Sequence, residues 1–333
     1  MKLAILGYKG FVGSAIYKHF SGINGYEVIG INRDNCSSLV GQYFDVFINA
    51  NGNSKKLLAA SGPKLDFEMN VQTTLNTLFD FKIGKYVYLS SVDVYNDVSN
   101  PLNNYEDVII KPELLSNYGF DKYLGELLVK KYAQNWLILR LGGMIGEGLK
   151  KNPIYDIIYL KKLFINPKSQ FQFINTAVVA KIIEKLLMKN KEVFNVCGKG
   201  AIMLDELITT FSINLQDYGT DIQHYEINTK NRKYYTSMIV PLCKIVADKR
   251  KNNAQIALFC PVVEMLLQLK EFITTMRQLD GYNKIHYFFL YRKGLSIDPY
   301  AELFKDLSAV HAKEEFSLGT SGAFFIGSYA LFR

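Results

Sequence analysis

The sequence has few cysteines and no long uncharged run, and both absences narrow the class of protein. The four cysteines, at positions 36, 197, 243 and 260, lie far apart and form no CxxC pair. We therefore expect neither a disulfide framework nor a metal site. The longest uncharged stretch, which contains the apolar residues 318–332, is shorter than the roughly 20 residues of a membrane-spanning helix, and the apolar run at residues 3–6 is too short for a signal peptide. These features predict a cytoplasmic protein without a membrane span.

The composition is that of a globular protein with a substantial core. Of the 333 residues, 49% are hydrophobic, 14% aromatic and 21% charged. The length allows one large or two modest domains, and the composition excludes disordered and fibrous classes. The formal net charge of +8 suits nucleic acid, an anionic membrane surface or a phosphorylated small molecule, and does not choose among them.

Short apolar runs alternate with helical patterns along the first two thirds of the chain. The strand-like runs are residues 3–6, 28–31, 46–48, 86–89 and 137–141. Apolar residues at three- and four-residue spacing occur in residues 11–20, 66–81, 118–134 and 176–189. This alternation predicts the α/β class, with a doubly wound parallel sheet covered by helices on both faces.

A glycine-rich turn follows the first expected strand and opens the first expected helix. Residues 7–13 read Gly-Tyr-Lys-Gly-Phe-Val-Gly. Glycine lets the chain turn sharply and approach a pyrophosphate, and the helix N-terminus offers free N–H groups to the phosphates. The turn predicts a dinucleotide site, although a tight turn without a ligand is the alternative. The residues expected to contact the cofactor here are Gly7, Lys9, Gly10, Phe11 and Val12.

Asn32 and Arg33 follow the second expected strand. An acidic residue here would accept the ribose hydroxyls of NAD, whereas arginine pairs with the 2′-phosphate of NADP. The pair therefore favours NADP, with NAD as the alternative cofactor. A solvated loop arginine is the other interpretation of Arg33.

The order of the remaining motifs resembles that of the extended short-chain dehydrogenase/reductases and, more narrowly, of the nucleotide-sugar epimerase/dehydratase family. The motifs are Asn49-Ala50-Asn51-Gly52, Met69-Asn70-Val71, Ser90-Ser91-Val92-Asp93-Val94-Tyr95, Tyr118-Gly119-Phe120-Asp121-Lys122 and Leu139-Arg140-Leu141 with Gly146. The resemblance covers about residues 1–235. It implies a Rossmann-like NAD(P)-binding domain at residues 1–240, with a small substrate lobe largely within 142–240.

The resemblance also implies a catalytic set of Ser91, Tyr118 and Lys122. Tyr118 and Lys122 lie at i and i+4, so a helix places both on one face, where the ammonium can lower the pKa of the phenol. Tyr118 would exchange a proton with a sugar hydroxyl while the nicotinamide exchanges a hydride. The further cofactor contacts implied are Asn49, Ala50, Asn51, Asn70, Leu89, Tyr118 and Lys122.

Departures from the family pattern narrow the reaction. In the family's 4,6-dehydratases an Asp and a Glu follow the catalytic hydroxyl residue, whereas Val92 and Asp93 follow Ser91. Valine cannot protonate a leaving hydroxyl, so we do not expect the usual dehydratase mechanism, and Asp93 remains as a lone base at the substrate. Epimerisation and keto-sugar reduction stay open, and Arg33 favours reduction. A short gap between the glycine turn and Asn49 predicts that one βα unit is trimmed.

A nucleotide-sugar substrate gives the positive charge a local explanation. Arg140 or Arg232 can pair bidentately with the diphosphate of the nucleotide sugar. The alternative for Arg140 is a bond to backbone within the fold. We expect a homodimer that does not bind nucleic acid and that serves polysaccharide or lipopolysaccharide-type biosynthesis. The alternative function is a non-catalytic NAD(P)-binding regulator or scaffold of the same fold.

The C-terminal segment, residues 253–333, has its own α/β alternation and no counterpart in the family. Strands are expected at residues 256–259 and 285–291, and helices at 262–276 and 301–307. The first strand faintly resembles the opening strand of inverting family 2 glycosyltransferases. The alternative is an appendage for packing or oligomerisation, because the apolar run at 318–332 would then be buried.

Overall fold

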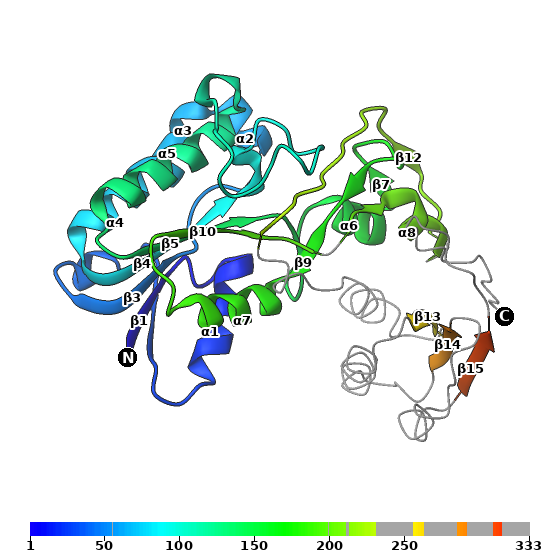
Figure 1. Cartoon of the computed structure of the whole chain (residues 1–333), viewed down its shortest axis with the longest axis horizontal. Coiled ribbons are helices and arrows are strands. Elements are labelled where there is room, and N and C mark those ends of the chain that lie inside the picture. Colours follow the sequence, from blue (N-terminus) through cyan, green and yellow to red (C-terminus); the bar gives the residue numbers. More distant parts are fainter. Residues whose placement is uncertain are drawn as a thin grey trace. The chain divides into compact units, whose positions relative to one another are not determined.

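The computed structural model describes residues 1–54, 56–198, 200–210 and 213–230, together with strands at 256–262, 285–291 and 309–314 (Figure 1). The chain divides into two compact units. The first contains Met1–Asn152, Lys168–Ile202 and Asp221–Ser237, and the second contains Pro153–Pro167, Met203–Thr220 and Met238–Arg333.

A six-stranded parallel sheet forms the centre of the first unit, in the order β10-β5-β4-β3-β1-β2. Its strands are β1 (Lys2–Leu6), β2 (Glu27–Ile31), β3 (Tyr43–Asn49), β4 (Lys82–Ser91), β5 (Trp136–Leu141) and β10 (Glu192–Val196). Strand β2 lies on one side of β1, and β3, β4, β5 and β10 follow in order on the other side. This is the doubly wound arrangement expected from the sequence. The pairs Leu6–Asn49 and Ser91–Leu141 align the carboxyl ends of these strands along one edge.

Helices cover both faces of this sheet (Figure 1). Helices α1 (Phe11–Ser21) and α7 (Thr176–Leu186) lie on one face, and α4 (Thr73–Asp80) and α5 (Asn117–Tyr132) lie on the other. Alternate residues of β1 supply the two cores: Leu3 and Ile5 pack with the α1 and α7 side, and Ala4 and Leu6 pack on the opposite side. This period of two is the reason that the strands read as short, wholly apolar runs.

Two connections differ from regular βα units. Only a short 3₁₀ turn, η1 (Ser37–Leu39), lies between β2 and β3, so the prediction of a trimmed βα unit is confirmed. The helix expected over residues 66–81 is divided into α3 (Pro63–Phe67), a π-helical turn η2 (Glu68–Gln72) and α4. The π turn carries Asn70, and π turns often occur at functional sites.

The remaining elements of the first unit are short. They are α2 (Lys56–Ser61), η3 (Val92–Val94), η4 (Pro112–Leu114), β6 (Gly143–Ile145), β8 (Gln170–Phe171) and β9 (Phe173–Asn175). Strands β6 and β9 pair in parallel. Because α7 and β10 belong to the main sheet and its helical layer, the range 142–240 contains cofactor-side elements besides the expected substrate lobe.

The second unit contains two small parallel sheets. Strands β7 (Lys162–Leu163) and β12 (Asp217–Tyr218) form one pair, and α6 (Pro153–Tyr155), η5 (Asp156–Leu160) and α8 (Leu204–Thr210) belong to the same unit. Strands β13 (Ile256–Val262), β14 (Ile285–Tyr291) and β15 (Ala309–Glu314) form a three-stranded sheet.

Both strands expected in the C-terminal segment are present, and β15 was not predicted. Apart from Val262, which ends β13, the helices expected at 262–276 and 301–307 lie outside the described residues, as does the apolar run at 318–332. The chain passes from the first unit to the second within strand β11 (Ile202–Met203).

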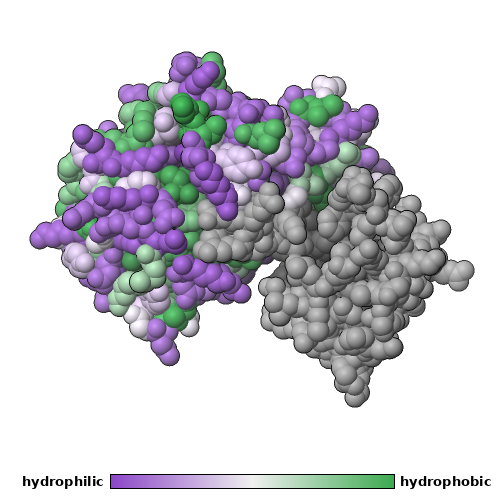
Figure 2. Space-filling view, viewed as in Figure 1, coloured by the Kyte–Doolittle hydropathy of each residue, from purple (hydrophilic) through white to green (hydrophobic). Residues whose placement is uncertain are grey.

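The described surface of the first unit is mainly hydrophilic, with scattered apolar side chains (Figure 2). Among the described helices, none is long and apolar enough to cross a membrane.

Candidate active site

The glycine turn between β1 and α1 is built so that only glycine fits. Gly7 has a φ of +79°, and the Gly10 N–H donates to the Gly7 carbonyl at 2.8 Å. A Cβ on Gly13 would lie 2.2 Å from the Gly7 oxygen, so the helix begins directly against the turn. Gly10 caps α1 without a side-chain hydrogen bond, which leaves the first N–H groups of the helix to a ligand. This cradle fits the pyrophosphate of a dinucleotide.

The other residues expected in the turn line its outer side. Lys9 is exposed, with its ammonium 5.7 Å from the centre of the Tyr8 ring, and Phe11 and Val12 are half-buried at the start of α1. At the end of β2, Asn32 is committed to its own loop, where its Oδ1 accepts from the N–H groups of Asp34 and Asn35. Arg33 is exposed beside it.

The end of β3 forms the next part of the site. The Asn49 amide donates to the Tyr86 hydroxyl at 2.9 Å and to the Thr74 hydroxyl at 3.2 Å, so this side chain holds β3 to the helical layer. Only the backbone at Asn49 is therefore left to face a cofactor. Half-buried Ala50 and Asn51 follow, and the Asn51 N–H donates to the Asn49 side chain.

Ser91, Tyr118 and Lys122 come together at the carboxyl edge of the sheet. Ser91 is the last residue of β4, and Ser116 caps α5 by accepting from the Gly119 N–H at 3.2 Å, which places Tyr118 in the first turn. A Cβ at Gly119 would lie 2.2 Å from the Asp93 carbonyl oxygen, so glycine lets α5 approach the segment after β4. The Tyr118 phenol lies beside the Ser91 side chain.

Burial dominates the electrostatics of the two α5 residues. It raises the pKa of Tyr118 well above its ordinary value, the charge of Asp93 raises it further, and the neighbouring Ser91 side chain acts in the opposite sense. The sequence-based expectation of a lowered phenol pKa is thus not met. Burial also lowers the pKa of Lys122 to about 8, against the charges of Asp66 and Glu126.

Lys122 lies among buried acceptors. Its ammonium donates to the Leu89 carbonyl at 3.2 Å, and Asn70 from the π turn presents a buried side-chain oxygen that has no hydrogen-bond partner. A Cβ on Gly52 would come within 2.3 Å of that oxygen and 3.3 Å of the ammonium. A lysine and an unpaired acceptor in a space kept open by glycine fit the hydroxyls of a ribose.

Two buried carboxyl groups, Asp66 and Asp121, lie near Lys122 and were not predicted from the sequence. Asp66 is fully buried, and its Oδ1 accepts from Asn53 at 2.7 Å and from Asn70 at 2.8 Å. Asp121 is also buried, and its pKa is raised to about 7 by burial, by a hydrogen bond with Asp66 and by the charge of Asp66. Asp121 therefore keeps its proton to a much higher pH than an ordinary aspartate does.

Asp93 is the centre of a second polar cluster. It accepts from the Ser91 hydroxyl at 2.9 Å, from the Lys56 ammonium at 2.6 Å and from the Tyr225 hydroxyl at 3.0 Å. The sequence indicated Asp93 and missed Lys56 and Tyr225, because they lie on α2 and on a segment far along the chain.

Arg140 requires a correction. It is 2% exposed, and its guanidinium pairs bidentately with Glu126 at 2.9 and 2.8 Å and donates to the Tyr95 hydroxyl at 2.9 Å. The prediction that Arg140 binds a substrate diphosphate is therefore wrong, because these groups inside the fold use its donors. Arg232 lies outside the described residues.

The sheet order and the glycine turn define a Rossmann-like fold, with Ser91, Tyr118 and Lys122 at the carboxyl edge of its sheet. Residues 3–161 match the model of the NAD dependent epimerase/dehydratase family.

Solved structures with the same fold include enzymes that act on nucleotide sugars. RMD from Pseudomonas aeruginosa complexed with NADPH is 20% identical, with a TM-score of 0.60 over 74% of this chain and 99% of that one. UDP-glucuronic acid 4-epimerase from Bacillus cereus, in complex with UDP-glucuronic acid and NAD, is 18% identical, with a TM-score of 0.59 over 73% and 96%. A dTDP-4-dehydrorhamnose reductase from Clostridium acetobutylicum is 20% identical, with a TM-score of 0.55 over 66% and 84%. None of the curated proteins compared matches the sequence.

Proposed function

We propose that the protein is an NAD(P)-dependent oxidoreductase that acts on a nucleotide sugar, by keto-sugar reduction or by 4-epimerisation, in polysaccharide-type biosynthesis. The observation that carries the proposal is Tyr118 held against Ser91, with Lys122 in the same buried region. The family match at residues 3–161 supports it. Two structures with the same fold, one complexed with NADPH and the other with UDP-glucuronic acid and NAD, support it as well.

The chain offers a complete set of groups for the dinucleotide. Backbone N–H groups around Gly10 would hold the pyrophosphate, Arg33 the adenosine side, and Lys122 with Asn70 the ribose hydroxyls. When bound, the nicotinamide supplies or accepts the hydride.

Tyr118 supplies the proton chemistry. In reduction, its hydroxyl gives a proton to the carbonyl oxygen of the sugar, and in oxidation its oxygen takes one from the sugar hydroxyl. Ser91 orients the phenol, and Lys122, one turn further along α5, would favour the phenolate form once it arises. Val92 is buried and has no titratable group, so the residue directly after Ser91 cannot supply the acid that elimination of water needs.

Substitution of the tyrosine tests the proposal. Purified protein is incubated with NADPH and dTDP-4-dehydrorhamnose, and separately with UDP-glucose or UDP-glucuronic acid, and products are separated by chromatography. Tyr118→Phe is expected to lower kcat by roughly 10²- to 10⁴-fold. Tyr132→Phe, an exposed tyrosine on the same helix, is the matched control. Absence of turnover with every substrate, or an unchanged Tyr118→Phe variant, contradicts the enzymatic function and leaves the regulator or scaffold.

Arg33 tests the choice of cofactor. Arg33→Ala is expected to weaken NADPH binding by about tenfold, because a charged hydrogen bond to the 2′-phosphate is lost, and to leave NADH binding unchanged. Titration of intrinsic or cofactor fluorescence measures both affinities. Equal effects on the two cofactors contradict the NADP preference.

A further inference from the structure

A series of neighbouring polar groups leads from Tyr118 to the protein surface. Ser91 lies beside the Tyr118 phenol, Ser91 donates to Asp93 Oδ2 at 2.9 Å, and Lys56 donates to Asp93 Oδ1 at 2.6 Å. Exposure rises along this path, from 8% for Tyr118 to 14% for the Asp93 side chain and 52% for the Lys56 side chain. The path therefore begins at a buried phenol and ends at an ammonium that reaches water.

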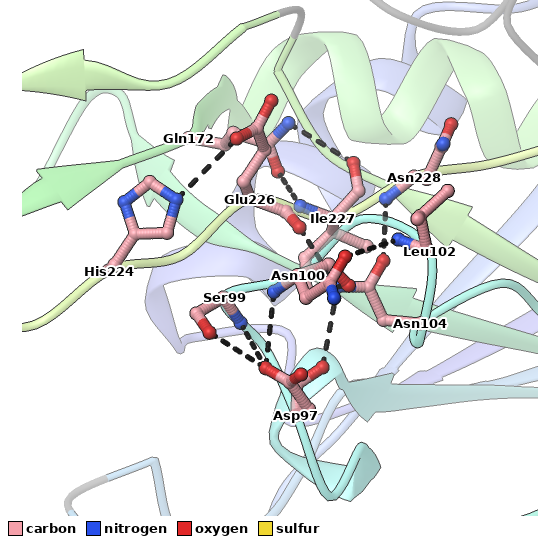
Figure 3. Close-up of polar contacts among 10 residues, drawn as sticks. All are labelled: Asp97, Ser99, Asn100, Leu102, Asn104, Gln172, His224, Glu226, Ile227 and Asn228. Atoms are coloured by element: carbon pink, nitrogen blue, oxygen red, sulfur yellow. Dashed lines mark hydrogen bonds and ion pairs between the residues drawn. The ribbon is translucent and has the colours of Figure 1, made fainter.

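The outer end of the path is held in place from two sides. The Tyr225 hydroxyl contacts both Lys56, at 2.6 Å, and Asp93, and the Lys56 ammonium lies 4.7 Å from the centre of the Tyr225 ring. The segment that carries Tyr225 is fixed in turn: Asn104 donates to the Glu226 carbonyl at 2.9 Å, and the Ile227 N–H donates to Gln172 at 2.7 Å. Figure 3 shows the contacts of Asn104 and Gln172 with this segment, next to the loop that Asp97 organises.

The two candidate reactions differ in their need for protons. A 4-epimerase takes a proton from the sugar when it oxidises the alcohol and returns it when it reduces the ketone, so Tyr118 ends each cycle as it began. A reductase transfers one hydride and one proton to the carbonyl and leaves a phenolate. Tyr118 must then receive a new proton in every turnover.

We propose that Lys56, Asp93 and Ser91 form a proton relay that resupplies Tyr118 from solvent, and that the reaction is accordingly the net reduction of a keto sugar. This inference rests on the proposed function and selects one of its two reactions. Asp93, which the sequence indicated as a lone base, becomes a carrier between Lys56 and Ser91.

Each transfer forms one bond to hydrogen as it breaks another. The Lys56 ammonium gives a proton to the Asp93 carboxylate, whose carboxyl group turns about its Cβ–Cγ bond toward Ser91. The Ser91 hydroxyl turns from Asp93 to the phenolate and gives up its hydrogen while its oxygen receives the proton of Asp93. The neutral amine of Lys56 then takes a proton from water, and no electrons are exchanged.

The ionisation of the two ends is suited to this transfer. Burial lowers the pKa of Lys56, but the charges and hydrogen bonds of Asp93 and Tyr225 outweigh it, so that the pKa is raised. The pKa of Tyr118 is raised as well, because of burial and of Asp93. The raised pKa of Tyr118 therefore favours the return of a proton to a phenolate at this site.

Comparison of the first turnover with later turnovers tests the relay. Enzyme is mixed rapidly with NADPH and dTDP-4-dehydrorhamnose, and NADPH absorbance is followed. In Lys56→Met the first turnover is expected to keep the wild-type rate, because Tyr118 starts protonated, whereas the steady-state kcat falls about tenfold at unchanged KM. Methylamine is expected to restore the steady-state rate. Lys64→Met, an exposed lysine on α3, is the control.

A second variant keeps the test independent of folding. Lys56→Arg retains the charge beside Asp93 but does not release its proton, so it is expected to fold as wild type and to show the same loss in later turnovers. If Lys56→Met slows the first turnover equally, or methylamine has no effect, Lys56 only holds the site and the relay is overturned. Later turnovers at the wild-type rate overturn it too.

The relay and the proposed function fail differently. If wild-type protein interconverts UDP-hexoses but reduces no keto sugar, the proposed function stands and the relay is overturned. If wild-type protein acts on no nucleotide sugar and Tyr118→Phe changes nothing, the proposed function fails and the relay with it.

Discussion

Gly13 cannot carry a larger side chain unless the turn between β1 and α1 moves. A Cβ there would lie 2.2 Å from the Gly7 carbonyl oxygen, which is backbone and has little freedom to give way. We expect Gly13→Ala to destabilise the protein by about 1–3 kcal/mol, the usual range for overpacking, and to weaken NADPH binding. Urea unfolding and NADPH titration measure the two effects. Gly22→Ala, at the other end of α1, meets only ordinary contacts at 3.5 Å and is the control. A Gly13→Ala protein as stable as Gly22→Ala contradicts the argument.

Asp121 makes stability depend on pH in a defined sense. Its folded-state pKa is about 7, whereas an aspartate in an unfolded chain has a pKa of about 4. Between these values the folded protein holds a proton that the unfolded chain has lost, so the stability contributed by protonated Asp121 falls as the pH rises through this window.

Asp121→Asn removes this titration and keeps a hydrogen-bond donor for Asp66. The Tm of the variant relative to wild type is therefore expected to be more favourable above pH 7 than near pH 5, as measured by thermal unfolding in matched buffers. Glu113→Gln changes an exposed carboxylate in the same way and serves as the control. A Tm difference for Asp121→Asn that is equal at both pH values contradicts the raised pKa of Asp121.

The sequence indicated Ser91, Tyr118 and Lys122 because their motifs are local, and it missed Lys56 and Tyr225 for the opposite reason. These last two are 169 positions apart, and only the fold brings the ammonium and the hydroxyl to 2.6 Å. The prediction for Arg140 failed for another reason: the ability of arginine to pair bidentately suggested a diphosphate ligand, whereas its partner Glu126 comes from the buried face of α5. Spacing within one motif cannot reveal such partners.

At the scale of elements, the strands and helices of the main sheet followed from periodicity, because wholly buried strands and amphipathic helices leave distinct patterns. Strand β10 was not among the strands expected from the sequence, and its place beside β5 is decided by topology. The π turn η2 was hidden because an extra residue in a helix barely changes the apolar spacing.

A buried ion pair joins α5 to β5. Glu126 is fully buried and Arg140 nearly so, and Ser90 on β4 donates to the same carboxylate at 2.7 Å. We expect Arg140→Met to cost about 3–5 kcal/mol, because it leaves the Glu126 charge buried without its partner. Urea unfolding measures the loss.

The double variant Glu126→Leu with Arg140→Met is expected to recover most of that stability, because no charge remains buried. The KM for a nucleotide sugar tests the same assignment from another side. A stable Arg140→Met protein with a strongly raised KM would return Arg140 to the substrate site.

At the scale of the whole molecule, the net charge of +8 is suited to attracting the phosphates of the proposed ligands. Several lysines are already paired at the surface, as in Lys18 with Glu147 and Lys189 with Glu192. Exposed pairs of this kind contribute little to stability. Ligand binding is therefore a larger source of additional stability than rearranged surface charge.

NADPH is accordingly expected to stabilise the folded protein by mass action. At about 100 times its Kd, a ligand that binds only the folded state adds about 2.7 kcal/mol, which thermal unfolding at increasing NADPH concentration measures. Gly13→Ala is expected to lose this gain because the phosphate cradle is displaced, whereas Lys64→Met keeps it. Duplex DNA at the same phosphate concentration is the control for net charge, and it is expected to leave the Tm unchanged at moderate salt. A shift with DNA that disappears as salt rises, without one for NADPH, would show that the charge serves nucleic acid instead.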